Sequence, residues 1–518
     1  MKAAARQSAP AYAPLFPELP LRDNAVVAPG ELAVVNFAGA GGASIGIGRA
    51  LRRPVNIAIN HNPVALNVHR LNEPHTIHYI EDVWHVDPRE AVAGRPVALA
   101  QFSPDCTHFS RSRGGKPKSK KIRGLAWVAV RWAATVRPRV IIIENVSEFR
   151  TWGPLGKDGR PDPAQEGRTY RSFINALRRL GYEVEDRDLR ACDYGAGTTR
   201  TRFFLIARCD GAPITWPEPT HAAPDDARVL AGQLKPWPVA ADFIDWSKPT
   251  RTIFGRKTDI AEDSQKRIAI GFERWTLRAE RPFLVPDANA SAFIEKAYGG
   301  NYSGPGIPVT APLDTITTVD HHRLVTAHIG VYYGNDGKGD HGQPCTEPLR
   351  TIPTKDRFAL STACIYRNFG TSHSASIEQP AGTIVTTGCG KLGVTTCELD
   401  TVPEGGMLSR ARQVYALLMR FLGAERLGGN ADHDRQLVHL VLGGERFTVW
   451  DLRFRMFEPS ELYGCQGFPP EFIYDRTAEG KRLPKSVQNF HCGNSVSPYP
   501  MEAITAAQFI PQYQEAAD

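Results

Sequence analysis

The stretch QFSPDCTHFS, residues 101–110, places a cysteine directly after an apolar run. A thiolate is a strong nucleophile, and Cys106 would stand at the edge of a sheet, where ligands collect. Taken alone, such a cysteine is more often a buried structural thiol. The neighbouring Asp105 would oppose thiolate formation if its carboxylate lay within about 4–6 Å of the sulfur. We favour the alternative, in which Asp105 points away and caps the following turn of the S-P-D-C loop.

A carboxylate and two arginines offer further chemistry. Glu144 ends the apolar run of IIIENV (141–146), so we expect partial desolvation to raise its pKa and let it carry a proton near neutral pH. The alternative is a simple strand-end cap. In TTRTRFF (198–204), the alternation of a strand places Arg200 and Arg202 on one side, so both can point toward the same edge.

A glycine-rich turn, FAGAGG (37–42), stands between a predicted strand and a predicted helix. Glycines there let the backbone approach a ligand, and the helix N–H groups can hold an anion or a carboxylate. Any α/β protein can place glycines in such a turn, so alone the motif only permits a nucleotide-like ligand. Asn60 and Asp82 end the next two predicted strands, where an adenosine would find polar partners, although a strand-end Asp is often a cap.

These residues require a sheet that brings strand ends together. Alternating strands and helices are predicted at 32–37, 38–53 (a glycine-rich turn that enters a helix), 55–60, 63–71, around HYIEDV (78–83), 95–102, 124–138, 139–146, 168–180, 182–189 and 202–208. Such alternation with nearly continuous apolar strands predicts an α/β, doubly wound, mostly parallel sheet. The last two strands can form an antiparallel hairpin at its edge. A final helix over about 497–510 is expected to pack back on this domain.

Length, cysteine spacing and net charge limit the classes of protein to which the chain can belong. At 518 residues the chain exceeds one hydrophobic core, so two or more domains are expected. Its nine cysteines form no C-x-x-C pair, which argues against a zinc ribbon or a disulfide framework and favours reduced thiols in a cytoplasmic protein. No long apolar span or signal-peptide pattern is visible. A net charge of +7 permits a nucleic-acid partner without demanding one.

From about residue 215 to 445 the pattern changes. A Pro-x-x-Thr-Ile unit recurs in KPTRTIFGRKT (248–258), APLDTITTVDHHRLV (311–325), EPLRTIPTKDRFAL (347–360) and QPAGTIVTTGCGKLGV (379–394). The spacing is too irregular for a solenoid. We predict a separate, largely β domain whose loops carry polar residues, or else an ordinary β module in which each unit is only a turn and a strand.

The order of these motifs resembles that of the cytosine-C5 DNA methyltransferases. F-x-G-x-G-G is followed by C-x-x-F-S, E-N-V, R-x-R, a long insert and G-N-S-V. RMFEPSELYGCQGFP (455–469) and QNFHCGNSVSP (488–498) look like two further elements of the family. The prolines of residues 1–30 predict an irregular lead-in. The resemblance implies a catalytic S-adenosylmethionine-binding domain (31–214), a β-rich target-recognition domain (215–445) and a C-terminal return to the catalytic domain (446–518).

The resemblance also implies a reaction. Carbon 5 of cytosine is a poor nucleophile until a thiolate adds to carbon 6 and makes it enamine-like. Cys106 would add, Glu144 would hold and protonate N3, Arg202 would contact O2, and Arg200 would support the site. The methyl donor would be S-adenosylmethionine. Its implied contacts are Phe37, Gly39, Gly41, Gly42, Asn60, Asp82, Val83, Pro104, Leu125, Asn494 and Ser495.

The partner implied is double-stranded DNA, with the target base flipped out of the duplex. RSRGGKPKSKKIR (111–123) holds seven basic residues and no acid, which by composition alone indicates a solvated loop. Its place after Cys106 matches the mobile loop of the family, so it is expected to contact phosphates. The candidate DNA-binding residues are Arg111, Arg113, Lys116, Lys118, Lys120, Lys121 and Arg123.

The chain departs from the family pattern at three places. The usual Pro-Pro-Cys-Gln is here Pro104-Asp105-Cys106-Thr107, the ribose-binding acid is Asn60, and the Gln before R-x-R is Thr198. These changes bear on rate, cofactor affinity and the group transferred. The alternatives are the same chemistry on RNA or a free pyrimidine nucleotide, transfer of another one-carbon group, or a catalytically weak DNA-binding homologue. The large insert argues against a free nucleotide. We expect a cytoplasmic, nucleoid-associated monomer that needs no metal and no membrane.

Overall fold

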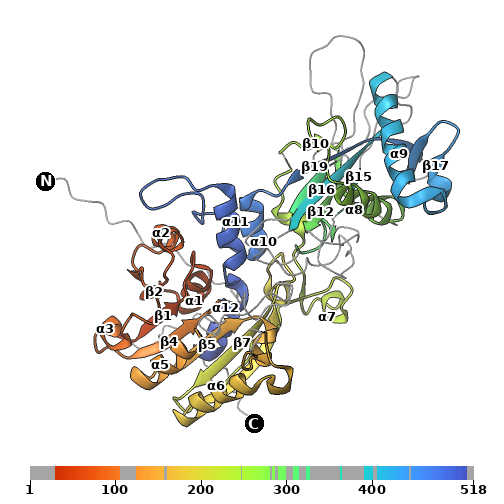
Figure 1. Ribbon diagram of the computed structural model, residues 1–518. Helices are drawn as coiled ribbons and strands as arrows, with labels where there is room; N and C mark the ends of the chain where they lie inside the picture. Colours follow the sequence, from red (N-terminus) through yellow and green to blue (C-terminus); the bar gives the residue numbers. More distant parts are fainter. Residues whose placement is uncertain are drawn as a thin grey trace.

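A computed structural model gives the fold of the chain (Figure 1). It describes residues 30–105, 124–156, 160–246, 248–279, 283–285, 290–298, 307–313, 322–326, 362–364, 390–400, 405–442 and 445–509. Cys106 and the basic stretch 111–123 lie outside the described residues, as do the expected lead-in and most of the Pro-x-x-Thr-Ile units.

The first sheet has seven strands in the order β3-β2-β1-β4-β5-β7-β6. They are β1 (Leu32–Asn36), β2 (Ile57–Ile59), β3 (Ile77–Tyr79), β4 (Val97–Phe102), β5 (Val140–Asn145), β6 (Glu183–Arg190) and β7 (Thr201–Arg208). The first five pair in parallel, and β1, β4 and β5 are buried throughout, as their continuous apolar runs predict. The predicted doubly wound, mostly parallel sheet is confirmed.

Helices cover both faces of this sheet. They are α1 (Gly42–Leu51), α2 (Pro63–Asn72), α3 (Pro88–Val92), α5 (Trp127–Thr135), α6 (Arg168–Arg179) and, from the far end of the chain, α12 (Pro498–Phe509). α3, α5 and α6 share one apolar cluster with the strand residues Val34 and Ile141. α1 and α12 share another with Val35 and Ile142 on the opposite face. The expected packing of the last helix on the first domain is confirmed.

The last two strands of the sheet run against the others. β7 pairs antiparallel with β5 on one side and with β6 on the other, so the predicted antiparallel hairpin at the edge is confirmed. Because β7 is reversed, its first residues lie at the same edge as the last residues of β5. Asn145 pairs with Phe203, which places Arg202 beside the end of β5.

A second sheet of ten strands follows in the chain. Its strands are β10 (Arg251–Thr252), β11 (Leu284–Val285), β12 (Ala290–Tyr298), β13 (Ile307–Pro308), β14 (His322–Thr326), β15 (Thr362–Cys364), β16 (Gly390–Asp400), β17 (Ala431–Asp432), β18 (Leu437–Leu442) and β19 (Glu445–Met456). All the pairings recorded for this sheet are antiparallel. β19 pairs with β14, β16 and β18, so the sheet continues past the boundary expected near residue 445 to Met456.

This second region is less purely β than its sequence indicates. Two helices, α8 (Glu262–Phe272) and α9 (Gly405–Leu427), accompany the sheet, and α9 was not predicted. Buried Glu273 accepts hydrogen bonds from Arg426 at the end of α9, which ties the two helices together. In the chain, the short elements β8 (His221–Ala222), α7 (Ala227–Leu230) and β9 (Lys235–Pro236) come between the strands of the two sheets.

Helices α10 (Pro459–Gln466) and α11 (Lys485–Asn494) join the two parts (Figure 1). Arg455, at the end of β19, forms a bidentate ion pair with buried Glu461 of α10, with N–O distances of 2.7 and 2.9 Å. Glu461 also accepts the backbone N–H of Asp245 at 2.9 Å. The R-x-x-x-P-x-E element in RMFEPSE therefore fastens the second sheet to the first domain.

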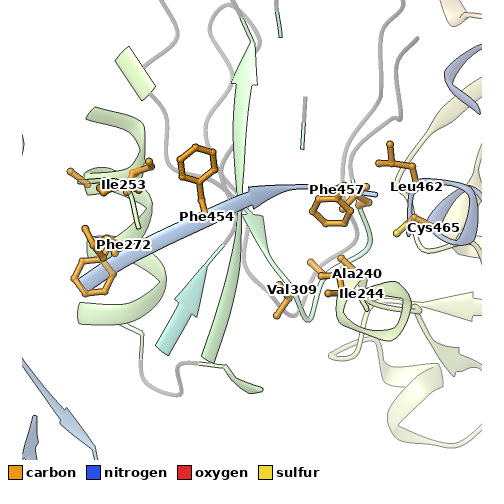
Figure 2. Packing of buried hydrophobic residues seen from close by; sticks show 14 of the residues in the cluster. Ala240, Ile244, Ile253, Phe272, Val309, Phe454, Phe457, Leu462 and Cys465 are labelled. Carbon is orange, nitrogen blue, oxygen red and sulfur yellow. The ribbon is translucent and has the colours of Figure 1, made fainter. Parts of the chain in front are cut away.

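One apolar cluster crosses this junction. Figure 2 shows Ile253, Phe272 and Phe454 of the second sheet region at one side and Leu462 and Cys465 of α10 at the other. The same cluster continues to Ala40 and Ile45 of the glycine turn and α1. The packing is thus continuous from the glycine turn to the second sheet.

Candidate functional site

The carboxyl edge of the first sheet gathers the predicted catalytic residues that the structure describes. β1 ends before Phe37, β4 ends before the loop to Cys106, and β5 ends with Glu144 and Asn145. The reversed β7 brings Arg202 to the same edge. This placement follows from the topology, because parallel strands end together and an antiparallel strand begins where they end.

Glu144 and Arg202 are in direct contact. Oε1 of Glu144 lies 3.3 Å from Nε of Arg202, and both side chains are buried. Burial raises the pKa of Glu144 above its ordinary value, although Arg202 and Arg200 oppose this shift. The expected desolvation of this carboxylate is confirmed, and it favours a protonated form that persists to higher pH than in an exposed glutamate.

Arg200, two residues before Arg202 in the chain, is also buried. Its Nη1 donates to the backbone carbonyl of Gly493 at 3.1 Å. Gly493 precedes Asn494 and Ser495, two of the expected cofactor contacts, so this arginine links the C-terminal segment to the beginning of β7. Thr198, which replaces the Gln of the family, accepts the N–H of Arg200 on its Oγ1 at 3.2 Å.

The loop that leads to Cys106 is held by the residue after Glu144. Nδ2 of the fully buried Asn145 donates to the carbonyl of Pro104 at 3.0 Å, and its Oδ1 accepts the N–H of Val146 at 2.9 Å. Pro104 is buried, whereas the side chain of Asp105 is exposed. Exposure favours the interpretation in which this carboxylate points away from the thiol.

The glycine-rich turn has strained backbone at a non-glycine residue. Phe37 adopts a φ of 60°, which β-carbon sterics disfavour and which is often found at functional sites. Gly41, with a φ of 116°, precedes α1, and no side chain among the described residues caps this helix. Its first N–H groups therefore remain available to a ligand. Gly39 also lies in the left-handed region.

Gly42 has a different reason to be glycine. A Cβ at this position would lie 2.1 Å from the carbonyl oxygen of Val496 and 3.1 Å from Cζ of Phe468. The C-terminal segment therefore occupies the space where a side chain would stand. Gly42 thus serves the packing of α1 against that segment.

Two other expected cofactor contacts follow β2 and β3, which lie on one side of β1 in the sheet. Asn60 follows β2 and accepts the N–H of Asn62 on Oδ1 at 3.0 Å. Asp82 follows β3, and its Oδ1 accepts the N–H of Trp84 at 3.0 Å, so this side chain caps the turn after the strand. Val83 is buried in the cluster that covers α5, and Leu125 packs against that cluster.

The C-terminal return supplies the final pair. Asn494 ends α11 and is exposed. Ser495 is buried, and its Oγ has no hydrogen-bond partner within the described part of the chain. Gln466 of α10 holds this turn. Its side-chain Nε2 donates to the backbone carbonyl of Ser495 at 3.1 Å, and its backbone carbonyl accepts from Oγ of Ser497 at 2.9 Å.

These observations fit a cofactor with an amino-acid end. The uncapped start of α1 suits a carboxylate, and the unpartnered Ser495 Oγ can bond a polar group at the same edge. The apolar residues Val83 and Leu125 suit an aromatic ring system. The residues present therefore fit the cofactor that the resemblance implies.

A chain of hydrogen-bond contacts among three polar side chains, largely buried, was not predicted from the sequence. Oγ of Ser44 in α1 lies 2.8 Å from Nε2 of His69, and Nδ1 of His69 lies 2.9 Å from Nε2 of His78. Burial lowers the pKa of His69 to about 3 and that of His78 to about 4. The three residues match no motif, and Ser44 is 25 residues from His69, so no local sequence pattern predicts the network.

Within the described ranges, no group of three or more His, Cys, Asp and Glu side chains is arranged to hold a metal ion. Among the helices that the structure describes, none is both long and apolar enough to cross a bilayer.

Comparison with known proteins agrees with this geometry. Residues 36–266 match the model of the C-5 cytosine-specific DNA methylase family. The type II methyltransferase M.AquIA of a Picosynechococcus species is 28% identical over 224 residues, which cover 41% of this chain and 87% of that protein. M1.HphI of Haemophilus parahaemolyticus is 27% identical over 36% of this chain and 48% of its own length. M.NaeI of Lentzea aerocolonigenes is 31% identical over 37% of this chain and 44% of its own length.

The similarity to the last two relatives thus spans less than half of their length. The family match itself begins at the end of β1 and includes the strand ends that carry Glu144, Arg200 and Arg202. Residues 36–266, with the sheet that arranges those residues, are thus similar to the C-5 cytosine-specific DNA methylase family.

Proposed function

We propose that this protein transfers a methyl group from S-adenosylmethionine to carbon 5 of a cytosine that is flipped out of duplex DNA. The observation that carries the proposal is the buried contact between Glu144 and Arg202, 3.3 Å apart, at the sheet edge where Asn145 holds the loop to Cys106. A cytosine ring offers N3 and O2 side by side, which a protonated carboxyl and a guanidinium can bind together.

Each residue has one task in the proposed reaction. The Cys106 thiolate adds to carbon 6 of the base and forms a C–S bond. Glu144 donates a proton to N3, which takes up the electron density that the addition pushes into the ring, and Arg202 donates to O2. Carbon 5 then carries the nucleophilic electron pair. After the methyl group has been bound there, loss of the C5 proton to a base returns electrons to the ring and breaks the C–S bond.

The cofactor site is proposed for the turn between β1 and α1. When bound, S-adenosylmethionine supplies the electrophilic methyl group. The N–H groups at the start of α1 and the Ser495 hydroxyl would hold its amino-acid end. Asp82 and Asn60 would contact the ribose and the adenine. Val83 and Leu125 would contact the adenine.

The second sheet is proposed as the part that recognises DNA. It is fastened to the catalytic part by Arg455 and Glu461, and the basic loop that follows Cys106 would contact the backbone of the flipped strand. Phosphate contacts of this kind make affinity strongly dependent on salt. The matched family, which is described as cytosine-specific DNA methylases, favours DNA over RNA as the substrate.

A covalent trap tests the proposal. The protein is incubated with labelled S-adenosylmethionine and duplexes that contain 5-fluorocytosine at many sequence contexts. Fluorine cannot leave as a proton does, so the enzyme should remain covalently bound through Cys106 and carry label on the DNA. Cys106→Ala should abolish trapping while it preserves cofactor binding.

Three other outcomes would contradict parts of the proposal. Trapping on RNA but on no duplex would favour the RNA alternative. Trapping with a labelled group other than methyl would favour another one-carbon transfer. Cofactor binding without any trapping on either nucleic acid would favour a catalytically weak homologue.

A further inference from the structure

Asn36, the last residue of β1, is a buried amide without a partner. Its side chain is fully buried, and within the described structure neither Oδ1 nor Nδ2 has a hydrogen-bond partner. Buried polar groups are nearly always paired, because burial removes their bonds to water. Two unpaired atoms on one side chain therefore call for a ligand or an ordered water.

The strand pattern shows which face this side chain joins. Leu32 and Val34 lie in the apolar cluster that α3 and α5 cover, while Ala33 and Val35 lie in the cluster on the opposite face. Alternation along a strand therefore places Asn36 on the face of Leu32 and Val34. Its neighbours in the sheet register are Ile59 of β2 and Phe102 of β4.

The same face carries the residues proposed to bind the cofactor. Val83 belongs to that cluster, and Phe37 and Leu125 pack against it. Asn36 also directly precedes the strained Phe37, and the glycine turn that begins there leads to the uncapped start of α1. The unpaired amide thus stands at the strand end, on the side where three proposed cofactor contacts gather.

We propose that Asn36 is a further cofactor-binding residue, whose side-chain amide hydrogen-bonds the amino-acid end of S-adenosylmethionine. A carboxamide offers both a donor and an acceptor, so it can bond the carboxylate through Nδ2 and the ammonium through Oδ1. This inference rests on the proposed function, since it requires that the protein bind this cofactor.

The test measures binding of S-adenosylhomocysteine by calorimetry and the melting temperature of the ligand-free protein. Asn36→Leu removes the amide at similar volume. Because a hydrogen bond to a charged group is lost, we expect affinity to fall about tenfold or more. The melting temperature should stay the same or rise, because the variant no longer buries an unpaired amide. Asn36→Asp separates the two bonds. Its affinity should be lower than that of Asn36→Leu if the contact of Nδ2 with the carboxylate dominates, because two negative charges then meet. Its affinity should be close to that of the wild type if the contact of Oδ1 with the ammonium dominates.

Trp132→Phe is the matched control. The Nε1 of Trp132 is also buried without a partner in the described chain, on the same face, where its ring lies 6.4 Å from that of Phe102. This variant should bind the ligand as the wild type does. If Asn36→Leu fails to fold, Asn36→Ala replaces it, with the same expectation for affinity.

The outcomes separate this inference from the proposed function. Wild-type protein that binds neither S-adenosylmethionine nor S-adenosylhomocysteine contradicts the proposed function. Wild-type binding that Asn36→Leu leaves unchanged overturns the inference alone and assigns the amide to an ordered water. An equal loss of affinity in Asn36→Leu and Trp132→Phe also overturns it, because the effect is then one of packing.

Discussion

Arg200 and Gly493, 293 residues apart in the chain, are joined by a hydrogen bond of 3.1 Å from Nη1 to the backbone carbonyl. Arg200 lies just before β7, and Gly493 lies in the last turn of α11. The bond therefore fixes the turn that carries Asn494 and Ser495 against the edge that carries Glu144. In the proposed enzyme this arginine positions the cofactor turn relative to the base.

Arg200→Lys should weaken both cofactor binding and methyl transfer. A lysine keeps the charge but lacks the planar donor set that reaches Gly493. We expect affinity for S-adenosylhomocysteine and kcat/KM for DNA each to fall severalfold or more. Arg187→Lys, at an exposed arginine of β6, is the control and should change neither quantity. A variant that loses activity while it binds the cofactor normally would contradict the positioning role.

Glu144→Gln should reduce kcat by at least about 100-fold, because the proton for N3 is lost. Raised by burial, the pKa of Glu144 lets its protonated form persist as pH rises, so wild-type kcat/KM should fall only above that raised pKa. Glu148→Gln, four residues along, is the control. Comparable losses in both variants would show that the effect is structural rather than chemical.

The sequence predicted the scaffold better than its contacts. The apolar runs of β1, β4 and β5 and the glycine turn are local patterns, and each appears where it was expected. The bond from Arg200 to Gly493 and the Ser44–His69–His78 chain join residues brought together only by the fold, so no local pattern encodes them.

The second region was predicted less well. The repeated Pro-x-x-Thr-Ile units predict strands and turns, whereas α9, in which Val414, Leu417 and Leu418 have helical spacing, was not predicted. At the junction, the sheet continues through β19 because β19 pairs with strands far from it in sequence. Register of this kind depends on tertiary pairing, which the sequence of one strand does not specify.

Asp105→Asn should change the rate by less than about fivefold. The side chain is exposed, and in a water-like dielectric a unit charge about 4 Å from the sulfur alters its energy by only about 1 kcal/mol. The measurement is the pH dependence of single-turnover methylation, with Asp105→Pro as the variant that restores the loop of the family. A large gain in rate in either variant, with a lower pH midpoint, would show that Asp105 opposes the thiolate.

Stability should fall on the acid side because of two buried histidines and one half-buried histidine. The pKa of His69 is lowered to about 3, and those of His78 and His491 to about 4, against about 6.5 in the unfolded chain. Between these values the unfolded chain binds more protons, so the free energy of unfolding decreases as pH falls from about 6.5 toward 4. Urea unfolding at several pH values measures this slope.

His69→Gln tests which histidine dominates. Glutamine can hydrogen-bond but does not titrate, so the acid slope should become shallower, whereas His75→Gln, at an exposed histidine, should leave it unchanged. An unchanged slope in His69→Gln would assign the acid sensitivity to other groups.

Gly42→Ala separates a packing role from a cofactor role in the glycine turn. The added Cβ would lie 2.1 Å from the Val496 carbonyl oxygen, which is backbone and cannot rotate away. The C-terminal segment must therefore shift, which should cost about 1–3 kcal/mol of stability. Because Val496 follows Ser495, affinity for S-adenosylhomocysteine should fall as well.

Gly406→Ala is the matched control for that variant. Its position lies in α9, and no heavy atom of the described structure stands within 4 Å of the added Cβ. Alanine there should leave ligand affinity unchanged and leave stability equal or slightly higher, because alanine favours a helix. If Gly42→Ala instead lost affinity with no loss of stability, the glycine would serve the approach of the cofactor, and the contact with Val496 would have to yield at little cost.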